Sequence, residues 1–289
     1  MSVMISPSPF IVGVGRSGST MLRLMLDSHP AMAIPTETHF LPQVFAAAQQ
    51  TGDPLRVWRA FVEAVTWPNM GVSQEKLLSV LRAQPVVTAG SAARAFYRLY
   101  AEGQGKTRWG DKTPPYRACM GKIASGLPEA RFVHIFRDGR DVALSHRGLW
   151  FGPGDDIAAQ AKFWVEQVRQ TRELGARMGG YTEIRYEDLV RHPEDQLRTL
   201  CDWLELDYRP CMLMSHVRAE ERLAEFVQAF GPAGRPPPAL DQFVSIHNRT
   251  REPPDVSRIG RWKTEFTEEE RRIYADIAGP TLDLLGYEL

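Results

Sequence analysis

The stretch IVGVGRSGST, residues 11–20, contains the residue types that bind a phosphate or sulfate group. Its three glycines let the backbone turn tightly and bring N–H groups close to an anion, although such turns also occur for packing alone. A helix that begins near Ser19 would direct the positive end of its dipole to the same point. A loop of the GxxxxGK[ST] type would have lysine where Ser19 stands, so Arg16 is the nearest cation.

A second cation follows another predicted strand. The run RFVHIF, residues 131–136, leads to Arg137, and Ser145 follows eight residues after that arginine. Open α/β folds bind ligands at the carboxyl ends of their strands. Arg137 and the loop at 13–20 therefore predict a ligand with two separated phosphate groups. Taken alone, Arg137 could equally belong to a solvated turn with local ion pairs.

Strand-then-helix units would position these residues. Strands that alternate with helices predict an α/β fold in which helices flank a parallel sheet. The apolar runs that predict strands, each paired with the helical segment after it, are 9–14 with 19–30, 131–136 with 139–150, and 181–186 with 193–206.

The remaining segments predict what surrounds the sheet. Residues 42–105 have the pattern of helices with loop breaks, and 157–176 that of one long helix. The proline-rich stretch 231–256 cannot be regular throughout, which predicts a loop or lid. Thr267 and Glu270 have the spacing of a capping box that opens a last helix. No repeat or boundary divides the chain, so we expect one domain over residues 1–289.

Composition excludes several classes of partner. The 35 basic residues balance 35 acidic ones, which argues against nucleic acid or an anionic membrane as the partner. The three cysteines, at positions 119, 201 and 211, form neither a disulfide framework nor a CxxC pair, which indicates a reducing compartment. The sequence contains no secretory signal pattern and no run of about 20 apolar residues. We therefore expect a cytoplasmic protein without an integral membrane segment.

The ordered motifs resemble those of the sulfotransferases that use 3′-phosphoadenosine 5′-phosphosulfate (PAPS). In that family a loop of the form RSGTT follows a strand and holds the 5′-phosphosulfate, while an arginine and a serine eight residues apart hold the 3′-phosphate. The resemblance implies a sulfotransferase fold with a P-loop-type sheet, PAPS as co-substrate, 3′-phosphoadenosine 5′-phosphate (PAP) as product, and no metal ion. The matching positions, each with an implied nucleotide contact, are Arg16, Ser17, Gly18, Ser19, Thr20, Arg137 and Ser145.

The pattern is most similar to the protein-tyrosine sulfotransferase branch. LDSHPAMAIPTETHF has the His-Pro pair of that branch and leads to Glu37, at the place of its catalytic base. WGDKTPPY is similar to the segment with its catalytic lysine, here Lys112, and RYEDLV to a segment whose tyrosine, here Tyr186, contacts the nucleotide. DVSRIGRWK resembles the late loop that closes over the nucleotide, which implies contacts from Ser257, Arg258, Ile259, Gly260 and Lys263.

These assignments imply in-line transfer of a sulfuryl group to a hydroxyl or amine. Arg16 and the loop amides would hold the 5′-phosphate, Lys112 would neutralise charge on the bridging oxygen, and Ser257 would donate a hydrogen bond there. Glu37 would take the proton of the acceptor, with His39 as the second candidate base. In an extended chain both side chains project to the same side, so both are expected to line the acceptor pocket.

Two neighbouring positions have open roles. Asp111 could orient Lys112 or be a simple turn residue. The tyrosine-sulfating enzymes have a further nucleotide-binding arginine four residues after the serine, where this chain has Leu149, and Arg147 is the candidate replacement.

The acceptor is open between small molecules, sugars, lipids and peptides. The tyrosine-sulfating enzymes carry a membrane anchor, which we do not find in this sequence, so the shared motifs do not make peptide tyrosine the acceptor. We expect residues 42–105 and 231–256 to build the acceptor pocket.

Two other functions fit part of the pattern. In a P-loop kinase, Thr20 would bind Mg²⁺ and ATP would be the donor, but such an enzyme uses the loop lysine that is missing here. A catalytically silent nucleotide-binding protein of the same fold is the other alternative. The presence of Glu37, Lys112 and Ser257 in matching segments favours an enzyme.

Overall fold

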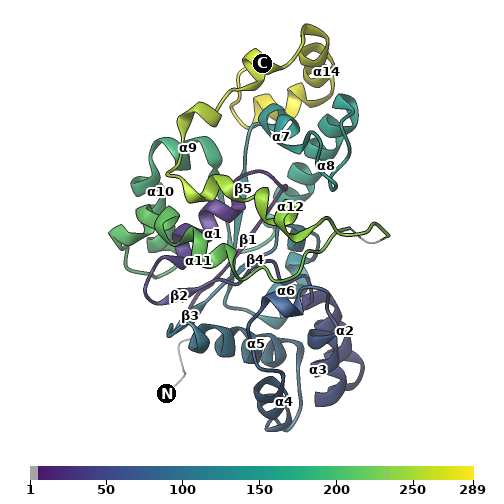
Figure 1. The fold of residues 1–289 in the computed structure, drawn as a ribbon, viewed down its shortest axis with the longest axis vertical. Helices are drawn as coiled ribbons and strands as arrows, with labels where there is room; N and C mark the ends of the chain where they lie inside the picture. The colour runs from purple at the N-terminus through teal and green to yellow at the C-terminus, as the bar shows by residue number, and fades with distance from the viewer. Residues whose placement is uncertain (1–5, 233) are drawn as a thin grey trace.

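A parallel β-sheet forms the centre of the molecule (Figure 1). The computed structural model describes residues 6–232 and 234–289. Four strands pair in the order β4-β1-β5-β6, and a separate short parallel pair joins β2 to β3. The predicted α/β class is therefore confirmed. The strands are β1 (Ser8–Gly13), β2 (Met32–Ala33), β3 (Arg108–Trp109), β4 (Asp111–Lys112), β5 (Ala130–Phe136) and β6 (Tyr181–Arg185).

The side chains of β1 divide the core between two faces of the sheet. Phe10 and Val12 belong to one apolar cluster and Ile11 to another, because successive side chains of a strand point to opposite faces. The Ile11 cluster includes side chains of α1 (Ser19–Asp27), α9 (Tyr186–Arg191) and α10 (Pro193–Trp203). The Phe10 cluster includes side chains of α2 (Leu41–Thr51), α3 (Pro54–Val62), α4 (Gln74–Arg82), α5 (Ala89–Gly103) and α6 (Met120–Gly126), most of which gather at the lower end of Figure 1.

A third cluster forms the opposite end of the molecule. It packs Val14 and Phe136 against α7 (Gly139–His146), α8 (Ile157–Gly175), α13 (Trp262–Glu265) and α14 (Glu268–Leu284). Thr267 and Glu270 form the predicted capping box at the start of α14. The helix predicted over 139–150 is too long. It ends at His146 because Arg147 has a non-helical ψ of 130° and Gly148 has a φ of 70°.

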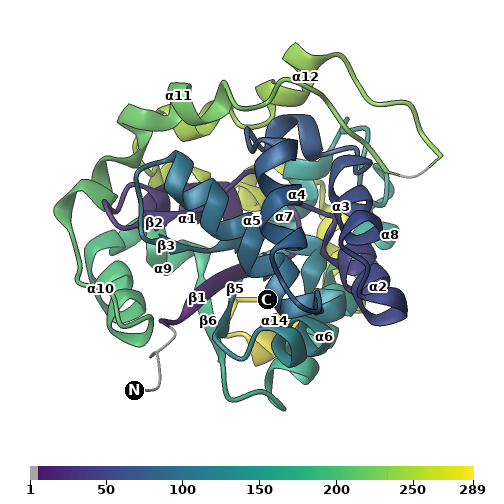
Figure 2. The same cartoon turned by 90° about the horizontal axis from the view of Figure 1, so that it is seen from below.

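The chain between α10 and α13 is built from short helices. Figure 2 shows α11 and α12 along the same side of the molecule. Phe226 and Phe243 from this part pack with Leu223 and Trp150 in a fourth apolar cluster. The predicted loop at 231–256 therefore also contains helical turns. The short elements of the chain are α11 (Ala219–Leu223), α12 (Leu240–Ser245) and the 3-10 helices η1 (Trp67–Asn69), η2 (Pro114–Cys119), η3 (Pro210–Arg218), η4 (Asn248–Arg251) and η5 (Val256–Arg258).

The strand register brings the two predicted anion-binding segments to one edge of the sheet. Gly13 pairs with Ile135, so β1 and β5 end at the same level. The loop after β1 therefore lies beside Arg137, which follows β5. Tyr186 follows β6 and is the first residue of α9 rather than the last of the predicted strand.

Candidate active site

The loop between β1 and α1 forms a tight cradle. A Cβ at Gly13 would lie 2.4 Å from the carbonyl oxygen of Ile135, and one at Gly18 would lie 2.5 Å from the Tyr186 ring. Gly18 and Arg16 have φ values of 93° and 70°, in the left-handed region. Ser17 is fully buried, and no described polar atom pairs with its Oγ. A buried hydroxyl without a partner inside a cradle of backbone N–H groups fits an anionic ligand.

Direct contacts join the two predicted phosphate motifs. The Arg16 Nε donates to Ser145 Oγ at 3.1 Å, and the Arg137 Nη1 donates to the Arg16 carbonyl oxygen at 3.4 Å. The Arg137 guanidinium lies over the Tyr186 ring, 4.5 Å from its centroid. The loop after β1, the end of β5 and the start of α9 are therefore one continuous site.

The site has excess positive charge. No carboxylate of the described residues forms an ion pair with Arg16. Burial and the charges of Arg137 and Arg258 together lower the pKa of Arg16 to about 10, while Glu37 opposes them. A bound anion would relieve this repulsion between cations.

The late loop at 255–263 is fixed to α7 by one carboxylate. Asp141 accepts hydrogen bonds from the backbone N–H groups of Gly260 at 2.7 Å and Trp262 at 3.1 Å. The Arg137 Nη2 donates to the Arg258 carbonyl oxygen at 2.6 Å. Burial raises the pKa of Asp141, with Arg137 and the two N–H groups opposing it. This loop therefore lies against the same arginine that follows β5.

Several predicted residues face one cleft between the phosphate loop and the segment at 246–258. Ile259 and Gly260 lie in the loop that borders it. The predicted residues that line it are Arg16, Gly18, Ser19, Thr20, Arg137, Ser145, Tyr186 and Arg258. The lining residues that the sequence reasoning missed include His247, Arg249, Thr250, Glu252 and Asp255.

Three other residues considered from the sequence do not line this cleft themselves. The Lys263 Nζ donates to Glu288 at 2.6 Å, and Ser257 Oγ donates to the Asp255 carboxylate. The Arg147 Nη2 pairs with Glu270 at 2.6 Å, and its replacement of the missing arginine at Leu149 stays a prediction. Arg249 and Arg258 are the additional cations that line the cleft.

Glu37 and Lys112 form an ion pair beside the cleft. Glu37 Oε1 lies 2.7 Å from Lys112 Nζ, and Glu37 Oε2 lies 2.9 Å from His39 Nε2. Burial would raise the pKa of Glu37, but Lys112 and His39 outweigh it and hold this pKa far below its usual range. Burial lowers the pKa of Lys112, and Glu37 opposes that shift. The sequence thus identified three groups that meet in space.

Asp111 forms hydrogen bonds to the segment that carries Glu37. Its Oδ2 accepts hydrogen bonds from Thr38 Oγ1 and Tyr97 OH, both at 2.8 Å. Thr38 stands between Glu37 and His39, and His39 has a φ of 56°, which is uncommon for a residue with a side chain. These contacts attach Asp111 to the Glu37 segment, and its orientation of Lys112 stays a prediction.

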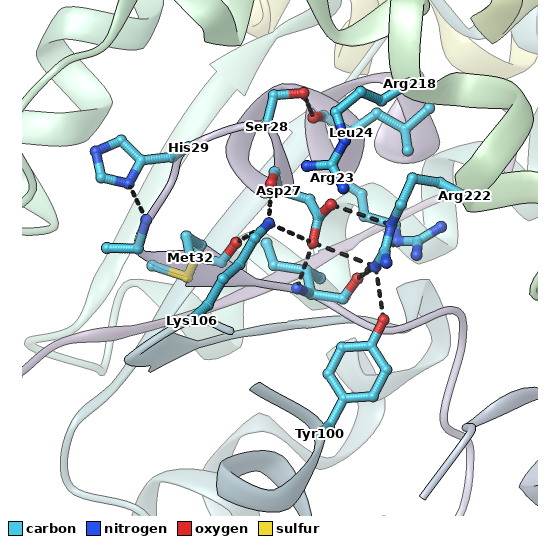
Figure 3. A network of polar contacts seen from close by, with 12 residues as sticks. Arg23, Leu24, Asp27, Ser28, His29, Met32, Tyr100, Lys106, Arg218 and Arg222 are labelled. Atoms are coloured by element: carbon cyan, nitrogen blue, oxygen red, sulfur yellow. Dashed lines mark hydrogen bonds and ion pairs between the residues drawn. The ribbon is translucent and has the colours of Figure 1, made fainter. Parts of the chain in front are cut away.

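A buried ionic network holds the chain just before Glu37 (Figure 3). Asp27 Oδ1 accepts from the Ile34 N–H at 2.9 Å, and the Arg23 Nε donates to the Ile34 carbonyl oxygen at 2.9 Å. The Arg222 Nε pairs with Asp27 Oδ2 at 3.0 Å, and its Nη2 donates to Tyr100 OH at 2.6 Å. Lys106 Nζ also donates to the Asp27 carbonyl oxygen. The network therefore connects α1, α5 and α11 to the segment that carries Glu37.

Residues 6–232 and 234–289 contain no group of three or more His, Cys, Asp or Glu side chains arranged to hold a metal ion. Among the helices of those residues, none combines the length and the apolar character that crossing a membrane requires.

Sulfotransferases are among the known proteins that resemble this chain in sequence and in structure. A family model described as "Sulfotransferase family" matches residues 7–210. Protein-tyrosine sulfotransferase 1 of Danio rerio is 26% identical over 292 residues, which cover 98% of this chain and 72% of the relative. Nodulation protein NoeE of Sinorhizobium fredii is 26% identical over 314 residues, covering 100% of this chain and 68% of the relative.

The solved structures agree with the sequence relatives. The sulfotransferase domain of the olefin synthase of Synechococcus PCC 7002 has a TM-score of 0.60 at 20% identity, and the alignment covers 98% of this chain and 95% of that domain. The sulfotransferase domain of the curacin biosynthetic pathway has a TM-score of 0.58 at 20% identity and covers 99% of each chain. These likenesses confirm the fold, and the family match over residues 7–210 shows that the chain belongs to the sulfotransferase family.

Proposed function

We propose that this protein transfers the sulfuryl group of PAPS to a hydroxyl or amine acceptor. The observation that carries the proposal is one cleft lined by both the phosphate loop after β1 and Arg137 after β5. A mouse sulfotransferase of similar fold, with a TM-score of 0.50 at 13% identity, has been solved in complex with PAP. A ligand with two phosphate groups would pair with the cations at both ends of the cleft.

The residues of the cleft fit such a ligand. Ser17 supplies a buried hydroxyl without a described partner, and Arg16 has its pKa lowered by burial and by neighbouring arginines. The Tyr186 ring, held between Gly18 and Arg137, offers an apolar surface beside the cations. We propose that Ser19, Thr20 and Ser145 complete the contacts to the two phosphate groups, with Arg258 and Gly260 closing the late loop over them.

The proposed chemistry is a single in-line displacement. The acceptor atom bonds to sulfur as the bond from sulfur to the bridging oxygen breaks, and PAP leaves with the electron pair. Glu37 takes the proton of the acceptor, and its low pKa keeps it ionised beforehand. Lys112, 2.7 Å from Glu37, neutralises charge on the departing oxygen. Ser257 can donate there only after its hydroxyl leaves Asp255.

The proposed binding site for the acceptor lies beside His39. The side chains of His39 and Glu37 are 31% and 22% exposed, so both remain accessible from solvent. The Phe230 ring packs edge-on to His39 with centroids 5.2 Å apart. We propose that the acceptor reaches Glu37 along this wall. The acceptor classes to test are small molecules, sugars, lipids and peptide tyrosine, the last because the Danio rerio relative is a protein-tyrosine sulfotransferase. The proposed location is the cytoplasm.

Transfer of label from ³⁵S-PAPS tests the proposal and the role of Glu37 together. We expect the protein to label an acceptor in a mixed panel of phenols, sugars, lipids and tyrosine peptides. Glu37→Gln should lower the labelling rate at least about 100-fold, the low end for general base catalysis, while PAP binding measured by calorimetry changes less than about twofold.

Glu102→Gln, at an exposed position on α5, is the matched control and should label as fast as the parent. Unchanged labelling by Glu37→Gln would show that Glu37 is not the base and would leave His39 as the candidate. Release of phosphate from ATP and Mg²⁺ without any use of PAPS would contradict the sulfotransferase assignment.

A further inference from the structure

His247 lies at the boundary between the nucleotide cleft and the acceptor side. It comes from the segment after α12, lines the cleft, and is 9% exposed. Its Nδ1 lies 3.4 Å from Thr20 Oγ1, on the first turn of α1. The Phe226 ring holds the His247 ring in place, because the two rings stack with centroids 5.4 Å apart and an interplanar angle of 6°.

The chain on either side of this contact is fixed independently. The Arg16 Nη2 donates to the carbonyl oxygen of Ile246, the residue before His247, at 3.2 Å. Glu225, the residue before Phe226, pairs with Arg23 at 2.9 Å. Buried Asn69 accepts hydrogen bonds from the next two backbone N–H groups, at 227 and 228, both at 2.9 Å. The plane of the imidazole is therefore held by contacts that do not involve Thr20.

Burial is the main reason that the His247 ring is neutral. Burial, together with the charges of Lys112, Arg16 and Arg23 and against that of Glu37, lowers the pKa of His247 to about 3. A neutral imidazole has one N–H donor and one acceptor nitrogen. The direction of its hydrogen bond to Thr20 then decides what the threonine hydroxyl can offer to a ligand.

We propose that His247 is a positioning residue whose Nδ1–H donates to Thr20 Oγ1 and so directs the Thr20 hydroxyl proton toward the anionic end of the nucleotide. A threonine hydroxyl has one proton and can both donate and accept. If His247 supplies a proton to the Thr20 oxygen, the hydroxyl proton stays available for a phosphate or sulfate oxygen. If Thr20 donated to His247 instead, the anion would face only a lone pair. The inference rests on the proposed binding of PAPS.

Three substitutions at position 247 separate this role from packing. His247→Phe keeps a ring against Phe226 without any nitrogen. His247→Asn places a donor near the former Nδ1, and His247→Gln places one near the former Nε2. We expect the dissociation constant for PAP, measured by calorimetry, to rise about tenfold in the Phe and Gln variants, the cost of a lost hydrogen bond to a charged group, and to recover to within about twofold in the Asn variant.

A double-mutant cycle with Thr20 tests the pathway of the effect. Thr20→Val should weaken PAP binding, and adding His247→Phe to it should have no further effect, because both changes remove the same contact to the anion. His192→Asn, at an exposed histidine, is the control and should bind PAP as the parent does.

The outcomes distinguish this inference from the function on which it rests. Parent-like PAP binding by His247→Phe, equal rescue by Asn and Gln, or fully additive effects of the Thr20 and His247 changes would each overturn it. If the Phe variant does not fold, as judged by its thermal melt, the Asn and Gln pair decides the question. A parent protein that binds no PAP would instead contradict the proposed function.

Discussion

Gly18 brings the phosphate loop into contact with Tyr186, which follows β6 and lies against Arg137, the residue after β5. Its φ of 93° lies in the left-handed region, and a Cβ there would stand 2.5 Å from the Tyr186 ring. That ring in turn packs beneath the Arg137 guanidinium. A methyl group at position 18 would therefore displace the Tyr186 ring, and through that ring it would also disturb Arg137.

We predict that Gly18→Ala weakens PAP binding at least about tenfold and lowers the free energy of unfolding by about 1–3 kcal/mol. The first effect comes from displacement of Tyr186 and the second from the backbone conformation. Gly148→Ala is the matched control, because Gly148 has a φ of 70° but nothing within 4 Å of an added Cβ. Calorimetry with PAP and urea unfolding measure the two quantities. Equal PAP affinity in both variants would show that the contact with Tyr186 is irrelevant to binding.

The roles of single residues were predicted from the family resemblance more than from residue chemistry. Nothing in the types of Glu37 and Lys112 predicts that they pair, since they lie 75 positions apart. The likeness to the tyrosine-sulfating branch placed both at one site, and the structure has them 2.7 Å apart. The partner of Asp111 could not be predicted, because a turn carboxylate can pair with any donor that the fold brings near it.

At the scale of elements, the late loop depends on α7. Asp141 accepts two backbone N–H groups of that loop while lying 3.6 Å from Arg137. An asparagine at this position would keep one oxygen but turn an amide N–H₂ toward the second backbone donor. The loop at 255–262 would then lose one of its attachments next to the nucleotide cleft.

We expect Asp141→Asn to raise the PAP dissociation constant about tenfold, since a hydrogen bond to a charged group is lost. Amide hydrogen exchange of residues 256–262 should speed up, because their attachment to α7 is weakened. Asp276→Asn serves as control, as its exposed pair with Arg272 contributes little. Unchanged exchange in this loop would mean that contacts other than Asp141 hold it.

The elements themselves were predicted where hydrophobic periodicity was clear. The runs at 9–14 and 131–136 became adjacent parallel strands, and the rule for strand ends placed the first loop beside Arg137. The segment at 231–256 gave no periodic signal, so His247 and its contact with Thr20, 227 positions away, could not be predicted. The same holds for Arg222 and Asp27, whose pairing spans 195 positions.

For the whole molecule, the balance of charge conceals a local cluster of arginines, although one of them, Arg249, pairs with Glu252 and Asp255. Equal numbers of basic and acidic residues predict no preference for polyanions, yet the arginines at positions 16, 137, 249 and 258 line a single cleft. Composition can therefore exclude partners that bind a broad surface, but not a small anion. Only the strand order and the late segments bring these cations together.

Acid should destabilise the folded protein in part through His146. This histidine is 3% exposed between Phe151 and Phe163, and burial, with a smaller effect of Arg16, lowers its pKa to about 4. An unfolded histidine has a pKa near 6.5, so the stabilising effect is present above that pH and is lost as pH falls toward 4. Between pH 7 and 5 we predict that His146 accounts for about 2 kcal/mol of the fall in the free energy of unfolding.

Urea unfolding of His146→Phe at both pH values should show a fall smaller by that amount, whereas His192→Gln, at an exposed position, should match the parent. An equal fall in the parent and His146→Phe would show that this histidine is not held neutral by the fold.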